Sequence, residues 1–215
     1  MVCFQGGGCG GRVAGCCGNN GTFQNRCQTL GPIRAIDQYC LPAATAQGSI
    51  IPFASGAVPV ALTSLVGGVV ETPFYIGFGT AVPGALVGGV IVLPTVGALL
   101  NEAFTVPRTG SITSISATFT ITVALAIATT GTVRAQIYRA PAGSDTFSPT
   151  DAFVDLTPEI STLLAVGTTL SGSAVTAPVP VSAGDRLMMV FSLEGTTLAA
   201  AITGTASAGI AIAEA

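Results

Sequence analysis

The chain has no lysine, histidine or tryptophan among its 215 residues, and charged residues make up only 8% of it. A typical soluble domain carries about 25% charged residues. Without histidine the commonest general base is missing, and without lysine neither Schiff-base chemistry nor a Walker-type phosphate loop is available. We therefore predict a chain that is not an enzyme and takes no cofactor. With a net charge of −3 it also offers no basic patch for nucleic acid.

Cysteine is absent after residue 40, although the chain contains six cysteines. These are Cys3, Cys9, Cys16, Cys17, Cys27 and Cys40. The segment that holds them is rich in glycine and cannot bury enough apolar surface to fold alone. We predict an N-terminal connector arm over residues 1–40, a linker over residues 41–47 and one folded domain over residues 48–215.

Three roles remain open for these cysteines. Six cysteines allow 15 pairings within one chain, but the adjacent Cys16 and Cys17 favour different partners and hence bonds that reach other chains. A metal site would lack both histidine and a paired CxxC motif. Free thiols are the third role. We predict disulfide cross-links, some of them between subunits, and no metal.

The domain reads as β-structure. Apolar side chains alternate with threonine and alanine over residues 117–127, which is the period of a strand with one buried face. After a turn at residues 129–131 a second alternating run, residues 133–138, predicts an antiparallel partner for the first run. The strand spacing predicts an all-β antiparallel sandwich.

A run of five residues near the end of the chain is apolar on both faces. These residues are Leu187, Met188, Met189, Val190 and Phe191. A strand that is apolar on both faces needs a second layer or a neighbouring subunit over its outer side. The five residues are therefore candidates for a trimer interface, and we expect residues 208–213 to be the neighbouring strand.

No charge lies between Glu71 and Glu102, and residues 80–100 approach the length and apolarity of a membrane span. Pro83, Pro94 and the Gly88-Gly89 pair interrupt this segment, so we predict two short strands with turns and no membrane partner. The best helical candidate, residues 152–164, is interrupted by Pro158 in the same way. Asp151, Asp155 and Glu159 are spaced by four in this region, and we predict that they form a solvated acidic loop and not a catalytic or calcium-binding cluster.

Six segments of the domain are familiar from a known family: Ile50–Gly56, Gly77–Gly79, Asn101–Ile112, Ser114–Ala117, Tyr138–Pro141 and Ala183–Leu187. Together they resemble the C-terminal domain of the BclB-type exosporium glycoproteins of spore-forming bacilli. The resemblance implies a jelly roll similar to the tumour necrosis factor and complement-head folds, which form homotrimers. In that family the domain caps a collagen-like stalk, which this chain replaces with the cysteine-rich arm. Such arms are similar to the connectors of spore-appendage pilins.

Two halves of this kind predict an extracellular fibre subunit on the surface of a bacterial spore. Trimers would stack head to tail through their arms, and exosporium anchor and tip proteins would be the other partners. The alternatives are a discrete trimeric exosporium glycoprotein and a lectin-like adhesin. An adhesin would use aromatic residues in loops, for which Tyr75 and Tyr138 are the candidates in the domain.

Overall fold

The computed structural model describes residues 48–64, 71–93, 102–124, 130–160, 165–194 and 200–214. The predicted arm and linker lie outside these residues, and all six cysteines with them. The described residues contain strands, turns and loops but no helix. No helix in this part of the chain could therefore cross a membrane.

The strands are numbered in chain order. Their bounds are β1 Ser49–Ala54, β2 Val60–Ser64, β3 Glu71–Thr72, β4 Phe74–Ile76, β5 Ala81–Pro83, β6 Ile91–Val92, β7 Phe104–Thr105, β8 Gly110–Ala124, β9 Thr132–Ala140, β10 Thr146–Asp155, β11 Thr169–Val181, β12 Arg186–Glu194 and β13 Ala200–Glu214.

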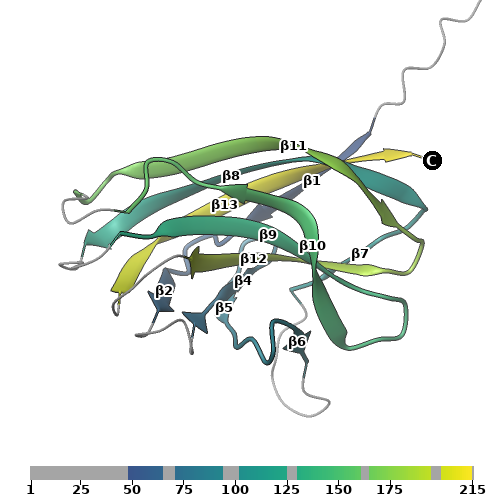
Figure 1. Ribbon diagram of the computed structural model, residues 1–215, viewed down its shortest axis with the longest axis horizontal. Coiled ribbons are helices and arrows are strands. Elements are labelled where there is room, and N and C mark those ends of the chain that lie inside the picture. Colours follow the sequence, from purple (N-terminus) through teal and green to yellow (C-terminus); the bar gives the residue numbers. More distant parts are fainter. Residues whose placement is uncertain are drawn as a thin grey trace, which may run out of the picture. The chain divides into compact units, whose positions relative to one another are not determined.

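Two antiparallel sheets face each other across one core (Figure 1). The first sheet has the order β11-β8-β13, with β1 and β2 one after the other along the outer edge of β13 and β3 beyond β2. The second sheet has the order β5-β4-β12-β9-β10-β6, with β7 beside the start of β12. The eight principal strands are β1, β4, β8, β9, β10, β11, β12 and β13. Counted 1 to 8 in chain order, they are arranged 1-8-3-6 in one sheet and 2-7-4-5 in the other. That order is the double Greek key of a jelly roll, as the family resemblance implied.

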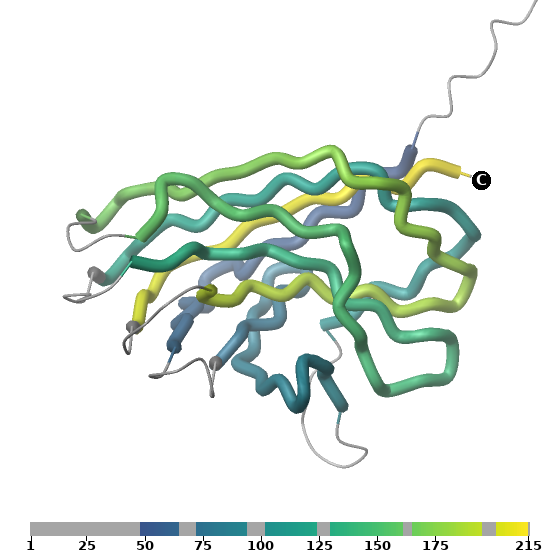
Figure 2. Tube along the Cα trace, in the orientation of Figure 1, coloured from purple at the N-terminus to yellow at the C-terminus, as the bar shows by residue number. Residues whose placement is uncertain are grey.

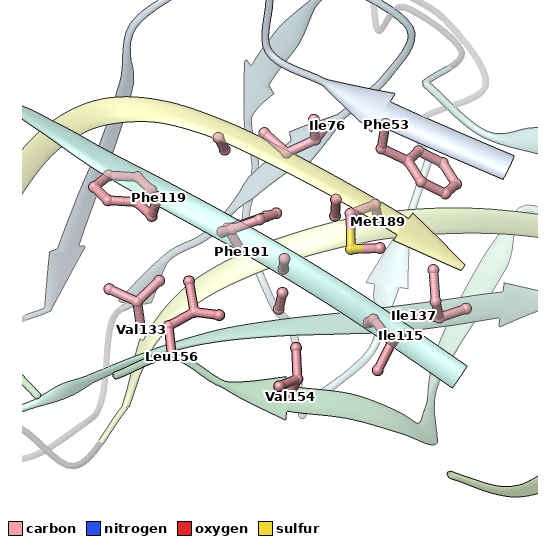
Figure 3. Close-up of a cluster of buried hydrophobic side chains, with 14 of the residues drawn as sticks. Phe53, Ile76, Ile115, Phe119, Val133, Ile137, Val154, Leu156, Met189 and Phe191 are labelled. Atoms are coloured by element: carbon pink, nitrogen blue, oxygen red, sulfur yellow. The ribbon is translucent and has the colours of Figure 1, made fainter. Parts of the chain in front are cut away.

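The core between the sheets is built from the apolar side of the alternating pattern (Figure 3). Phe119 of β8 and Phe191 of β12 lie 6.4 Å apart between ring centroids, one from each sheet. Ile115 and Ile137 are fully buried in the same cluster. Ser116, Thr118 and Thr120 lie between buried apolar residues of β8 and face outward, so the predicted period of two is confirmed over residues 117–121. It fails at Val123, which is 49% exposed, because the register with β13 shifts between residues 121 and 123.

Two of the predicted strand pairs are wrong. β8 pairs with β11 and β13, and the following strand β9 pairs with β10 and β12 in the other sheet. Likewise β12 and β13 lie in different sheets, so residues 187–191 do not pair with residues 208–213. In both cases the connection crosses from one sheet to the other, because a jelly roll pairs strands that are distant in sequence. Figure 2 shows β8 running between β13 and β11, which come far later in the chain.

Residues 86–93, together with residue 103, cover part of the outer side of the second sheet, beneath β4 and β12 in Figure 1. Leu86, Ile91 and Leu93 pack there on a second apolar cluster, whose sheet residues include Tyr138 and Met188. β5 and β6 confirm the expectation of two short strands. A two-residue turn lies between them, with Gly88 at φ 61° and Gly89 at φ 81°, a conformation that glycine adopts without strain.

Residues 152–164 do not begin a helix. Residues 152–155 complete β10, and their side chains alternate between buried and exposed. Ala152 and Val154 face the main core, whereas Phe153 and Asp155 face outward. Pro158, which interrupted the candidate helix in the sequence, lies just beyond this strand.

A candidate interaction face on the first sheet

The outward side of the first sheet is a surface of small, uncharged side chains. Directly opposed residues of antiparallel strands point to the same side, so the strand register arranges this surface in rows. From β11 to β1 the rows contain Val175, Ser114, Ala211 and Ile50; Ser173, Ser116, Gly209 and Pro52; Ser171, Thr118, Ser207 and Ala54; and, across three strands, Thr169, Thr120 and Thr205. We call this set the hydroxyl face. None of its members is charged.

Four of the nine hydroxyl groups of the face have a hydrogen-bond partner within the sheet. Ser116 Oγ and Ser173 Oγ share a hydrogen bond of 2.9 Å, and Thr120 Oγ1 and Thr169 Oγ1 share one of 3.0 Å. Just beyond the rows, Thr122 Oγ1 donates to the Thr203 carbonyl at 3.2 Å. Removing water from a polar group is costly mainly when the group is left without a hydrogen bond. These internal bonds therefore lower the free-energy cost of covering the face.

The second sheet has a different outer surface. The second apolar cluster lies on the covered part of this surface, and the exposed part carries charged side chains. Arg134 of β9 donates from Nε to Asp155 Oδ1 at 2.7 Å and from Nη2 to Asp155 Oδ2 at 3.0 Å. These bonds raise the pKa of Arg134. The guanidinium also lies over the ring of Phe153, 4.5 Å from its centroid, so this surface has the charged character of one that faces water.

A groove of about 250 Å³ opens at the end of the sandwich where β1 begins. Its walls are largely apolar, with Ile51, Phe104 and Ile212 among them. At its rim Arg108 Nη2 donates to Ser49 Oγ at 3.0 Å and forms an ion pair with Glu214. Because these polar groups are paired with one another, the groove offers no reactive group.

The five predicted interface residues on β12 lie inside the single chain. Leu187, Met189 and Phe191 belong to the main core, and Met188 and Val190 belong to the second cluster. All five are at most 1% exposed. The second layer that their pattern required therefore comes from residues 86–93 of the same chain. A role for them in a trimer would be indirect, through the residues that cover them.

Other sequence expectations have clear outcomes. Tyr75 and Tyr138 are strand residues of β4 and β9 and are buried, so the expectation that they lie in loops is wrong. Asp151 and Asp155 belong to β10, while Glu159 lies in the loop beyond it, and all three are exposed. No three acidic or sulfur-bearing side chains of the described residues are grouped so that they could hold a metal ion. The six cysteines lie outside the described residues.

The sequence pointed to only part of the hydroxyl face. Its threonines on β8 were visible as the polar positions of the alternating run. The matching alternation over Thr169–Ser173 and Thr205–Gly209 was an equally available signal. The alternation does not predict that all of these residues lie on one side of one sheet, because their common side depends on the strand order.

Comparisons with known proteins extend these observations. No family model matches the chain. Collagen-like protein 1 of Acanthamoeba polyphaga mimivirus is 35% identical to it over 177 residues, which cover 77% of this chain but 19% of that protein. Among solved structures, the Eiger TNF of S. frugiperda aligns with 77% of this chain and 96% of its own, at 10% identity and a TM-score of 0.34. The chain is thus similar, over most of its length, to a small part of a much longer collagen-like protein.

Proposed function

We propose that the chain is a structural subunit that self-associates through the hydroxyl face, as a homotrimer, and that such trimers build an extracellular fibre on a bacterial spore. The observation that supports this best is the contrast between the two sheets. The chain covers the second sheet with its own residues and leaves charge on the remainder. Within the described residues the outward side of the first sheet stays uncovered, and the rows of that face carry no charge.

Charge depletion of this kind is typical of the centre of a protein interface. A surface intended for water would gain solubility from charged side chains, and this one has none within its rows. Small side chains also allow backbones of neighbouring copies to approach closely. The sequence resemblance to a trimeric exosporium domain leads to the same proposal independently of the geometry.

The outward side of the first sheet is large enough for such a contact. β8, β11 and β13 are 13 to 15 residues long, and β1 adds a fourth, shorter strand. At ~3.3 Å per residue and ~4.8 Å between strands, the outward side of these four strands covers roughly 750 Å², of which the rows of the hydroxyl face make up roughly 400 Å². A standard interface buries about 800 Å² per partner.

In the proposed fibre, the cysteine-rich arm of residues 1–40 joins one trimer to the next. A contact between two different surfaces repeats without closing, and so produces a filament. Disulfides across such joints would oppose dissociation, because rebinding within a linked structure is effectively intramolecular. In this proposal the cysteine-free domain forms the trimer, and the cysteine-rich arm joins trimers into a fibre.

A discrete trimeric head on an exosporium surface is the second candidate. It is favoured by the similarity to a protein described as collagen-like, in which the matching region is a small part of the whole. The two candidates differ in the role of the arm, because a discrete head would remain one trimer when purified.

The hydroxyl face is tested with Thr118→Arg, in the middle row, against Ser148→Arg, an exposed position on β10 of the second sheet. We expect the wild type and Ser148→Arg to sediment as trimers and Thr118→Arg to sediment as a monomer. A trimeric Thr118→Arg protein, or a wild type that stays monomeric at micromolar concentration, would show that this face is not the interface.

The fibre is tested separately by replacing the arm cysteines with serine. Boiled wild-type material should run as a ladder on a non-reducing gel and collapse when reduced. If the serine variant forms fibres of unchanged length and denaturant resistance, the joint lies elsewhere in the chain.

A further inference from the structure

Ile50 and Val175 are the most exposed large apolar side chains among the described residues, at 76% and 91%. They belong to one row of the hydroxyl face, in which Val175 opposes Ser114, Ser114 opposes Ala211, and Ala211 opposes Ile50. The two aliphatic side chains therefore lie at opposite edges of the same face, separated by two small residues.

The backbone at these two edges limits how another chain could add to them. β1 carries Pro52, which has no N–H group, and the Ala54 N–H is used by the Gly77 carbonyl at 2.8 Å. On β11, Ser171 exchanges hydrogen bonds of 2.8 and 2.9 Å with Thr157. Beyond Val175 the strand register shifts, and Pro178 and Pro180 follow. Proline and register shifts at sheet edges oppose the addition of a long extra strand. Side chains are therefore the better candidates for contact at these edges.

A ring of identical copies has a simple geometric requirement. If each copy turns the same face toward a common axis, the β11 edge of one copy meets the β1 edge of the next. Such a contact brings together two different surfaces, and each copy contributes both of them. The row that contains Val175 and Ile50 supplies an exposed aliphatic side chain at each of these edges, at the same level along the strands.

We propose that Val175 of one copy packs against Ile50 of the next copy, and that this contact closes the ring. The inference rests on the proposed self-association through the hydroxyl face and specifies the two edges that meet. It also accounts for two aliphatic side chains that are largely exposed to water in the single chain and contribute little to its stability. Burying both side chains in the ring removes that apolar area from water.

The test uses opposite charges at the two positions. Ile50→Lys and Val175→Asp should each weaken trimer formation at least about tenfold, corresponding to ~1.4 kcal/mol, because each places a charge against an aliphatic side chain at every contact of the ring. Combining both substitutions in one chain places Lys opposite Asp at every contact. The double variant should therefore recover most of the lost affinity, as measured by sedimentation equilibrium over a range of concentrations.

Two controls make the result specific. Val92→Asp changes a side chain that is 55% exposed on β6, away from the face, and should leave the trimer unchanged. Thermal unfolding of each variant should match the wild type at a dilution at which all are monomeric, since neither edge position is buried. The affinity that the double variant recovers should also decrease in high salt, because the new Lys–Asp pair is ionic.

The outcomes separate this inference from the proposed function. If Thr118→Arg abolishes the trimer while both edge variants leave it intact, the face is the interface but its edges do not meet as proposed. If the double variant associates no more tightly than the single variant with the lower trimer affinity, Val175 does not face Ile50. If affinity returns but the recovered species is a dimer, the ring is overturned in favour of a two-fold pair.

Discussion

The phenol of Tyr75 exchanges two hydrogen bonds with the backbone of Ala85. The hydroxyl donates to the Ala85 carbonyl at 3.0 Å and accepts from the Ala85 N–H at 3.1 Å. These bonds attach the covering segment to β4 of the second sheet. Nearby, Thr80 Oγ1 donates to the buried Glu102 carboxylate at 2.6 Å, which joins the residue just before β5 to a residue close to the start of β7.

Tyr75→Phe should destabilise the domain by about 1–3 kcal/mol, because it leaves both backbone groups of Ala85 without their partner in a partly buried site. The free energy of unfolding in urea measures this. Ser148→Ala, at an exposed position, is the control and should change the free energy by less than about 0.5 kcal/mol. A loss no larger than that of the control would mean that the segment is held by its apolar contacts alone.

Stability should fall at high pH through the same tyrosine. Burial raises the pKa of Tyr75 above its usual value of 10.0, although the bond to Ala85 opposes this rise. The unfolded chain then releases its proton at a lower pH than the folded chain, so stability is fully present below pH 10 and is lost as the pH rises through the folded pKa. Comparing wild type with Tyr75→Phe cancels the other tyrosines. The difference between their unfolding free energies should shrink above pH 10, and a constant difference would contradict the assignment.

Met188 and Met189 are neighbours on β12 that point into different clusters. Both are fully buried, Met189 in the main core and Met188 in the second cluster. Replacing either with alanine should therefore cost about 2–5 kcal/mol in the unfolding of a monomer. The Thr118→Arg background, expected to be monomeric, allows this measurement. If Met188→Ala leaves the monomer unchanged and instead weakens association of the wild-type chain, Met188 acts in the interface, as its sequence pattern first indicated.

Gly204 and Gly209 are both on β13, and the structure distinguishes them. A Cβ on Gly204 would overlap the Thr120 carbonyl oxygen and the Phe119 ring at a shift in the strand register, so Gly204→Ala should destabilise the monomer. A Cβ on Gly209 would point from the hydroxyl face and meet only the Ile51 carbonyl oxygen at 3.8 Å. Gly209→Ala should be neutral, or stabilise by up to about 1 kcal/mol through a less flexible unfolded chain.

The Gly209 variant has a second use, since its added methyl group lies in the second row of the hydroxyl face. In the trimer it should affect association while monomer stability is unchanged. Equal thermal stabilities for Gly204→Ala and wild type would contradict the inward placement of Gly204.

The strand character of this protein can be inferred from local residue patterns alone. The alternation of Ser114, Ser116, Thr118 and Thr120 with apolar residues is a local pattern, and it specifies a strand with one buried side wherever that strand lies. The absence of lysine and histidine is likewise complete in the sequence, as is the confinement of cysteine to the first 40 residues.

Which strands pair with one another depends on contacts between segments that are distant in the chain. β8 lies between β11 and β13, more than 40 residues further along the chain, and pairing at that distance leaves no local signature. The same reason explains why Met188 and Val190 were assigned to an interface: their cover, residues 86–93, is remote in sequence. The row that joins Val175 to Ile50 is assembled from four strands, and it exists only because the jelly roll places their polar sides on one surface.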